Sequence, residues 1–316
     1  MHSFKIFAGC TGRNFAEEIC RHLGVELGRS SGFCFSEGNT YVKIEETVRN
    51  MDIYLVQSIA MRPNDEFTEI LFWIDAFKRA SARSVTVILP YFGYAKGDKK
   101  DEARVSIRAR VCADCMEVTG ADRVVTMDLH SPQIQGFFKI PVDNLLAISS
   151  LCEHIGTIST GDMVVVSPDS GYARTARMYG KYLNRPIAIG DKVRTSHDET
   201  AIIMDIIGEV KGKDALIVDD FTNSGGTLVD LACKLKDRGV KRIYCALSHI
   251  LLNEAGVARI EASPIELLVS TDTVDNPYVG KSGKIKIVSV TSLFAKVIQC
   301  IENNESVSSL FEIYNQ

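Results

Sequence analysis

Two adjacent aspartates stand immediately before a loop of small residues in the second half of the chain. Asp219 and Asp220 follow the short apolar run 215–218, and residues 223–227 read Asn-Ser-Gly-Gly-Thr. We expect the backbone N–H groups of 224–227 to lack helical partners and to bind a phosphate group. Two carboxylates would repel that phosphate unless they bound hydroxyl groups or a cation. These residue types therefore indicate a site for a sugar phosphate together with Mg²⁺.

The elements that must position this loop are a strand and a one-sided helix. Residues 215–218 are typical of a buried strand, and the apolar residues at 228, 231, 232 and 235 predict a helix that is stopped by Gly239. For the Gly-Gly-Thr sequence alone, a tight turn with a helix cap is the simpler interpretation. The aspartate pair before the loop favours the ligand site. The loop is neither a P-loop nor a Gly-x-Gly-x-x-Gly dinucleotide turn.

Strand-like and helix-like segments alternate along the chain. Strands are predicted at 4–8, 33–35, 41–44, 52–57, 85–89, 123–128, 163–166, 186–189, 215–218, 242–248, 266–270 and 285–290. Helices are predicted at 13–23, 65–80, 104–119, 172–183, 228–239, 254–261 and 292–302. The alternation indicates an α/β protein with mostly parallel sheets flanked by helices. Both halves share it, which suggests two copies of one fold, at 1–147 and 148–301, with a C-terminal helix at 302–316 packing back on the first.

Two long polar loops and one histidine are further candidates for chemistry. Lys96, Lys99 and Lys100 of the loop 90–103, and Arg104 just after it, could bind a polyphosphate. The aromatic residues of the loop could stack on a base: Tyr91, Phe92 and Tyr94. A solvated charged loop is an equally good interpretation of that composition. The second polar loop is predicted at 190–199. His130 follows a predicted strand, where a ligand or metal could lie.

Composition narrows the class of protein. The 316 residues are 46% hydrophobic and 24% charged, and the net charge of −4 argues against a nucleic-acid partner. No apolar run approaches the roughly 20 residues that cross a membrane. The first residues show no signal-peptide pattern, and nine scattered cysteines fit reduced thiols, so we expect a cytoplasmic protein. The pair Cys112 and Cys115 lies in a helical pattern and is expected to pack, not to bind metal.

Several longer segments resemble the ribose-phosphate diphosphokinases, also called PRPP synthetases. They include Phe35-Ser-Glu-Gly, Pro90-Tyr-Phe-Gly-Tyr-Ala95, Asp128-Leu-His-Ser-Pro-Gln-Ile-Gln-Gly-Phe-Phe138, Val166-Ser-Pro-Asp169 and the loop 219–227. The resemblance runs from about Phe4 to Phe311. Other proteins with the phosphoribosyltransferase fold share only the ribose-phosphate loop, so the Asp128–Phe138 segment is highly specific.

The resemblance implies two phosphoribosyltransferase-like domains and an enzyme of nucleotide biosynthesis. Its members transfer the diphosphoryl group of MgATP to the C1 hydroxyl of ribose 5-phosphate, giving PRPP and AMP. Carried over to this chain, the catalytic residues are Lys192, Arg194 and His130, and Mg²⁺ lies at His130 and Asp169. Ribose 5-phosphate is expected at Asp219, Asp220, Asn223, Ser224, Gly225, Gly226 and Thr227. ATP is expected at Phe35, Glu37, Asn39, Lys96, Lys99, Asp101 and Arg104.

The resemblance also implies regulation and assembly. Phosphate and ADP act on family members as effectors at an interface, where Thr47, Gln135, Asn144, Ser306 and Ser308 match. Phe35 and Glu37 match positions that reach across a subunit interface, so a homo-oligomer is implied, in the family a dimer-based hexamer. Neither a nucleic acid nor a membrane is an expected partner.

Departures from the family pattern lie mainly at the nucleotide segment. The family usually reads Tyr-Ala-Arg-Gln-Asp where this chain has Tyr94-Ala-Lys-Gly-Asp98, and Asn39 stands where glutamate is common. Asn223 replaces an aspartate of many members, and Tyr172 replaces a small residue. These changes motivate an alternative, a weak or inactive regulatory paralogue. A phosphoribosyltransferase that consumes PRPP is a third hypothesis, but it explains neither the two-domain length nor the Asp128–Phe138 segment.

Overall fold

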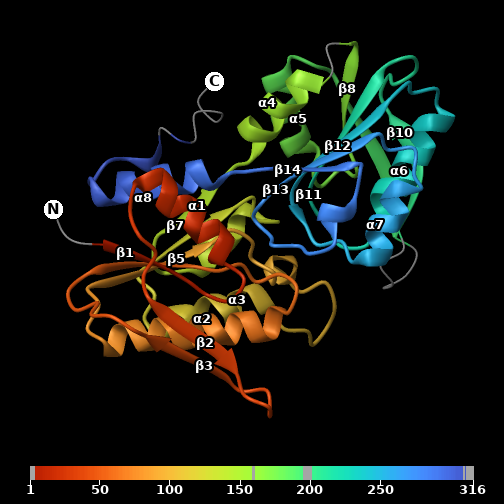
Figure 1. Ribbon diagram of the computed structural model, residues 1–316. Coiled ribbons are helices and arrows are strands. Elements are labelled where there is room, and N and C mark those ends of the chain that lie inside the picture. Colours follow the sequence, from red (N-terminus) through yellow and green to blue (C-terminus); the bar gives the residue numbers. More distant parts are fainter. Residues whose placement is uncertain (1–3, 159–160, 195–200, 309, 311–316) are drawn as a thin grey trace. The chain divides into compact units, whose positions relative to one another are not determined.

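The computed structural model describes residues 4–158, 161–194, 201–308 and 310, except the side chains of 192–194 and 201–204 (Figure 1). Contacts divide the chain into two compact units. The first comprises residues 1–146, 273–275 and 290–316, and the second comprises 147–272 and 276–289. Each unit has a sheet of its own, so the site is described unit by unit.

The first unit contains a five-stranded, wholly parallel sheet in the order β1-β4-β5-β6-β7. Its strands are β1 (Phe4–Ala8), β4 (Asp52–Val56), β5 (Ser84–Leu89), β6 (Arg123–Met127) and β7 (Val142–Leu145). Its helices are α1 (Arg13–Leu23), α2 (Pro63–Arg79), α3 (Arg108–Thr119) and α8 (Thr291–Glu302), with short 3₁₀ turns η1 (Ala95–Gly97) and η2 (Pro132–Phe137). A separate hairpin of β2 (Ser30–Cys34) and β3 (Thr40–Ile44) contacts α2 (Figure 1).

Apolar strands and helix faces build the core of the first unit. On α2 the buried side chains include Ile70, Trp73, Ile74 and Phe77, which recur at helical spacing. The ring of Phe77 lies 4.9 Å from that of Phe7 on β1. Although α8 follows the whole second unit in sequence, it packs against α1, where the rings of Phe15 and Phe294 are 5.2 Å apart. The C-terminal helix thereby belongs to the first unit.

The second unit contains a seven-stranded sheet in the order β10-β9-β8-β11-β12-β13-β14. Its strands are β8 (Met163–Ser167), β9 (Ile187–Arg194), β10 (Ala201–Ile207), β11 (Asp214–Thr222), β12 (Ile243–Ile250), β13 (Leu267–Thr271) and β14 (Ile285–Val288). Its helices are α4 (Ile148–Ile158), α5 (Ala173–Leu183), α6 (Gly226–Asp237) and α7 (Glu254–Glu261), with a 3₁₀ turn η3 (Val279–Lys281). Among the described strands of this sheet, only the edge strand β10 is antiparallel to its neighbour. The mostly parallel α/β fold predicted from the sequence is confirmed.

Several element boundaries differ from those predicted. Helix α3 begins at Arg108 and not at 104, because Arg104 has a φ of 66° and cannot lie in a right-handed helix. The strands β7 and β10 and the helix α4 were not predicted. The predicted polar loop 190–199 is wrong over its first part, since β9 continues to Arg194 and pairs there with Ala201. Residues 195–200 lie outside the described residues.

The C-terminal part of the chain differs from the prediction in the unit to which it belongs and in the residue at which its helix ends. Helix α8 was assigned to the domain 148–301, whereas its contacts group it with the first unit. It ends at Glu302, and residues 303 and 304 form a turn where a helix 302–316 was predicted. Residues 309 and 311–316 lie outside the described residues, so that part of the prediction stays open.

Candidate functional site

The polar side chains of the second unit gather where its parallel strands end. Val166 on β8 pairs with Ile217 on β11, so Asp169 and the pair Asp219–Asp220 follow at the same edge of the sheet. Carboxyl ends of parallel strands are the usual ligand-binding edge of such a sheet. The structure therefore brings together two parts of the predicted site that are about fifty residues apart in sequence.

The aspartate pair lies on the last residues of strand β11 and is held by the backbone. Oδ1 of Asp219 accepts a hydrogen bond from the N–H of Asp220 at 3.0 Å, and Oδ1 of Asp220 accepts one from the N–H of Phe221 at 2.9 Å. Burial raises the pKa of Asp219 well above its usual range, and the nearby carboxylates of Asp220 and Asp169 raise it further. Such crowding of negative charge favours a ligand that brings hydroxyl groups or a cation.

The loop between β11 and α6 has the backbone shape of an anion site. Gly225 is the N-cap of α6 and has a φ of 72°, a left-handed conformation that residues with a side chain rarely adopt. Two of the four N–H groups expected to be free are used locally: Gly225 N–H donates to Oγ1 of Thr222 at 3.2 Å, and Gly226 N–H donates to Oγ of Ser224 at 3.4 Å. The N–H groups of Ser224 and Thr227 donate to no atom of the described residues. They are the donors left for a phosphate.

Arg259 on α7 is a site residue that the sequence did not reveal. Its Nη1 donates to the carbonyl oxygen of Ser224 at 2.7 Å, and the same atom would lie 3.5 Å from a Cβ at Gly226. The guanidinium therefore braces the loop and adds positive charge beside it. The sequence pattern around Arg259 does not indicate this contact with the loop, because the contact joins residues 35 positions apart.

Asp169 fits a magnesium-binding role. Its Oδ1 accepts a hydrogen bond from the N–H of Tyr172 at 3.1 Å, which orients the carboxylate. In the described part of the chain no group of three or more His, Cys, Asp and Glu side chains could hold a metal by itself. Mg²⁺ is commonly bound by one or two carboxylates, waters and the oxygens of its phosphate substrate. Asp169 beside the aspartate pair suits that mode, because a cation would also relieve the repulsion on Asp219.

In the first unit, His130 follows the carboxyl end of β6. Asp128 precedes it with a φ of 41°, an uncommon backbone conformation for a residue other than glycine. The N–H of Leu129 donates to Oδ1 of Asn144 on β7 at 3.1 Å, so a predicted effector residue holds the backbone next to the histidine. His130 is exposed, whereas its metal partner in the prediction, Asp169, belongs to the second unit.

The loop after β5 divides into a buried half and an exposed half. Tyr91 and Phe92 are only 7% and 3% exposed, so the expectation that they stack on a base is wrong: they pack in the core. Tyr94 is partly buried and its ring lies 5.9 Å from that of Phe67. The predicted ATP residues of this loop are all exposed: Lys96, Lys99, Asp101 and Arg104. The left-handed backbone at Arg104 turns the chain before α3.

The β2–β3 hairpin presents the other predicted ATP residues. Phe35, Glu37 and Asn39 are exposed around its turn, with Gly38 at a φ of 95°. Phe35 is 44% exposed and belongs to an exposed aromatic cluster with Phe33 and Tyr41, whose rings lie 4.8 Å and 6.1 Å from its own. Exposed aromatic clusters commonly mark binding surfaces.

The predicted effector residues all belong to the first unit, and several of them take part in local hydrogen bonds. Gln135 Nε2 donates to the carbonyl oxygen of Pro132 at 3.0 Å, and Asn144 accepts the bond from Leu129. Thr47, Ser306 and Ser308 are exposed, and the N–H of Ser308 donates to Oγ of Ser306 at 3.1 Å. Lys192 and Arg194 lie on β9, and their side chains are outside the described residues.

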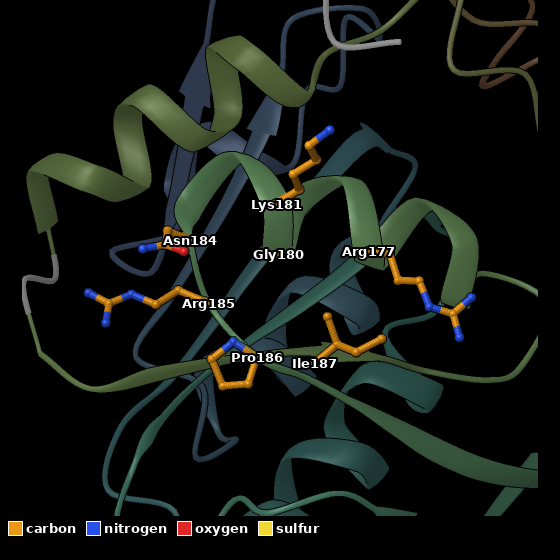
Figure 2. A pocket seen from close by; sticks show the side chains of 7 residues that line it. All are labelled: Arg177, Gly180, Lys181, Asn184, Arg185, Pro186 and Ile187. Atoms are coloured by element: carbon orange, nitrogen blue, oxygen red, sulfur yellow. The ribbon is translucent and has the colours of Figure 1, made fainter. Parts of the chain in front are cut away.

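An open hollow of 530 Å³ in the second unit is lined by Arg177, Gly180, Lys181, Asn184, Arg185, Pro186 and Ile187 (Figure 2). It lies where α5 ends and β9 begins, at the edge opposite Asp169 and Asp219. The charged ends of Arg177, Lys181 and Arg185 point in different directions. Cations near a helix C-terminus are explained by the helix dipole, so this hollow is not a candidate for the reaction.

Comparison with known proteins gives matches over both units. A family profile described as the N-terminal domain of ribose phosphate pyrophosphokinase matches residues 4–120, and one described as the phosphoribosyl synthetase-associated domain matches residues 169–312. A ribose-phosphate pyrophosphokinase of Caldanaerobacter subterraneus subsp. tengcongensis is 45% identical over 98% of each chain. One of Listeria ivanovii is 42% identical over 98% of this chain and 97% of its own.

A solved structure has the same fold over nearly the whole length. The crystal structure of phosphoribosylpyrophosphate synthetase from Mycobacterium smegmatis has a TM-score of 0.90 and 34% sequence identity, and the match covers 96% of this chain and 99% of that one. In the described part of the chain, no helix combines the length and apolarity that a membrane crossing requires.

Proposed function

Because the chain belongs to the ribose-phosphate pyrophosphokinase family, we propose that it transfers the diphosphoryl group of MgATP to the C1 hydroxyl of ribose 5-phosphate. The products are PRPP and AMP. One observation of the structure carries the proposal: Asp169, the Asp219–Asp220 pair and the phosphate loop meet at one edge of a parallel sheet. Carboxylates for sugar hydroxyls and unpaired N–H groups for a phosphate suit ribose 5-phosphate.

In the proposed complex each part of the second unit has one task. Asp219 and Asp220 accept hydrogen bonds from ribose hydroxyl groups, while the N–H groups of Ser224 and Thr227 bind the 5-phosphate. Arg259 keeps the loop in place through the carbonyl of Ser224. Fixing the sugar in this way orients its C1 hydroxyl for in-line attack on the β-phosphorus, and positioning of this kind supplies much of phosphoryl-transfer catalysis.

The nucleotide is assigned to the exposed cations and aromatic residues of the first unit. Lys96, Lys99 and Arg104 face the phosphates, and Phe35 with Glu37 receives the base. We assign Lys192 and Arg194 to the transferring group, whose negative charge they stabilise. Asp169 would hold Mg²⁺, which would neutralise phosphate charge. His130 is the second residue that the resemblance assigns to the metal.

The proposal includes assembly and location. The exposed aromatic cluster around Phe35 suits contact with a second copy of the chain, so we propose a homo-oligomer, with a dimer-based hexamer as the form implied by resemblance. Phosphate and ADP are the proposed effectors. All nine cysteines are free, which fits a reducing compartment such as the cytoplasm.

The deciding experiment mixes the purified chain with MgATP and ribose 5-phosphate and follows AMP and PRPP. We expect equal amounts of both products, because one diphosphoryl group leaves each ATP. Product with another nucleoside triphosphate but not ATP would place the Lys96–Gly97 departure in base recognition. No product with any donor, from a folded oligomer, would favour the regulatory paralogue, and base-dependent diphosphate release from PRPP would favour a phosphoribosyltransferase.

Inorganic phosphate is expected to activate this enzyme less than it activates typical family members. Thr47 replaces a common serine, and the side chains of Gln135 and Asn144 already take part in local hydrogen bonds. A phosphate ion must replace or rearrange those bonds before it gains its own. The measurement is the initial rate of AMP formation across a phosphate titration, with sodium chloride at matched ionic strength as the control. Activity that depends wholly on phosphate would contradict this expectation.

A further inference from the structure

Arg108, the first residue of α3, packs against the predicted nucleotide segment. Gly97 in η1 is buried, and a Cβ atom placed there would lie 2.7 Å from Nε of Arg108 and 2.8 Å from its Cβ. Contacts that short do not occur, so a side chain at 97 and this arginine exclude each other. The space that the family usually gives to a glutamine at position 97 is taken here by part of an arginine.

The charge of Arg108 has no partner in the described part of the chain. The side chain is exposed and forms no ion pair or hydrogen bond with any described residue. The first turn of α3 contains no acidic residue, and the N-cap Ile107 supplies no side-chain cap. A cation at the positive end of a helix dipole is unfavourable. An anion bound beside Arg108 would remove that cost.

The neighbours of Arg108 place it in the nucleotide segment and not on a remote surface. It lies against η1, which contains Lys96, and η1 and α3 contact each other. Burial raises the pKa of Tyr94, and the positive charge of Arg108 acts in the opposite direction. The site around residues 94–97 therefore has a guanidinium, although position 96 is lysine.

We propose that Arg108 binds the triphosphate of the donor nucleotide and compensates for the changes at positions 96 and 97. A guanidinium presents a planar fork that binds two phosphate oxygens, which a lysine ammonium does not. In this proposal Arg108 on α3 takes the role of the arginine that the family usually has at position 96. This inference rests on the proposed function, because it uses the assignment of residues 96–104 to ATP.

The test compares Arg108→Gln, Arg108→Lys and the control Arg79→Gln by steady-state kinetics and by equilibrium binding of ATP. Arg79 is another exposed arginine, on α2, whose partner is Asp75, and exposed pairs of this kind contribute little. We expect Arg108→Gln to raise the KM for MgATP and the Kd for ATP about tenfold, the loss of one charge-assisted hydrogen bond in a partly solvated place. The KM for ribose 5-phosphate should change less than about twofold. Arg108→Lys should recover part of the loss, and Arg79→Gln should match the wild type.

The outcomes separate this inference from the proposed function. An ATP Kd and KM within about twofold of wild type in Arg108→Gln would overturn the role of Arg108. An equal rise in both substrate KM values, with a lower melting temperature, would show that the arginine only fills space beside Gly97, and would overturn it too. If the wild type makes no PRPP, the proposed function fails, whereas the ATP Kd of Arg108→Gln still decides the role of Arg108.

Discussion

Replacing Arg194 with alanine is expected to lower kcat for PRPP formation about a thousandfold. Removal of one positioned donor from a developing negative charge costs roughly 10²–10³ in kcat, and removal of an arginine from a phosphoryl transition state can cost more. The KM for ribose 5-phosphate should change little, because that substrate is assigned to the loop after β11 and not to β9. The measurement is the initial rate of AMP release at saturating MgATP and ribose 5-phosphate.

The backbone of β9 is the structural basis for the role that we propose for Arg194. Ile189 pairs with Ser167 at the end of β8, and β9 then continues for five residues, from 190 to 194. At roughly 3.3 Å per residue this carries Arg194 about 16 Å past the end of β8. Pairing with β10 supports the extended strand, since Arg194 pairs with Ala201. The backbone of Arg194 therefore lies beyond the ligand-binding edge of the sheet, and the prediction rests on this placement.

The matched control for Arg194 is Arg185→Ala. Arg185 lies just before the same strand, at the opposite edge of the sheet beside the hollow of Figure 2. Its replacement removes the same charge from the same part of the chain and should leave kcat unchanged. Arg194→Lys keeps the charge but loses the bidentate fork, so it should recover part of the rate. An alanine variant that keeps more than about a tenth of the wild-type kcat would remove Arg194 from the proposed machinery.

The sequence predicted the loop at the centre of the site because local patterns decide that part of the fold. The apolar residues Leu228, Leu231, Ala232 and Leu235 are all buried on α6, as their spacing predicted. The end of β11 was not predictable in the same way. The strand continues through the aspartates to Thr222 because β12 supplies partners as far as Ile250. A strand boundary set by a neighbour carries little signal in its own residues.

Contacts between distant residues account for most of what the sequence did not predict. Arg259 on α7 contacts Ser224 in the loop before α6. The role proposed for Arg108 depends on its packing against Gly97, eleven positions earlier. The burial of Tyr91 and Phe92 was not predicted for the same reason, since the rest of the core decides it. Helix α4 is different: Ile148, Leu151, Cys152 and Ile155 are buried at helical spacing, and that periodicity was present in the sequence.

Asp219→Asn is expected to lower kcat/KM for ribose 5-phosphate by about 10- to 100-fold while raising the thermal stability of the free protein. A hydrogen bond from a substrate hydroxyl to a charged acceptor contributes about 1.5–3 kcal/mol, which sets the size of the activity loss. Asparagine keeps an oxygen for the bond from the N–H of Asp220. It removes the charge that burial and the neighbouring carboxylates disfavour. Activity and stability should therefore move in opposite directions.

The sign of the stability change follows from the direction of the pKa shift. The pKa of Asp219 is higher in the folded protein than in the unfolded chain, so at low pH the group is protonated in both states and has no effect. As the pH rises past the unfolded value, ionisation favours unfolding, and the cost is complete once the pH exceeds the folded value. The advantage of the Asp219→Asn variant should thus be largest at neutral pH and vanish near pH 4. Each kcal/mol of relieved repulsion raises Tm by about 2–4 °C.

Melting curves of both proteins between pH 4 and pH 8, without Mg²⁺, measure this difference, and Asp230→Asn on the exposed face of α6 is the control. Adding Mg²⁺ and ribose 5-phosphate should stabilise the wild type more than the variant, because these ligands interact with the Asp219 carboxylate, which the variant lacks. A variant with lower Tm at neutral pH and unchanged kcat/KM would show that Asp219 supports the fold and not the sugar. A higher Tm with lost activity would mean that the site keeps a destabilising charge because its substrate needs it.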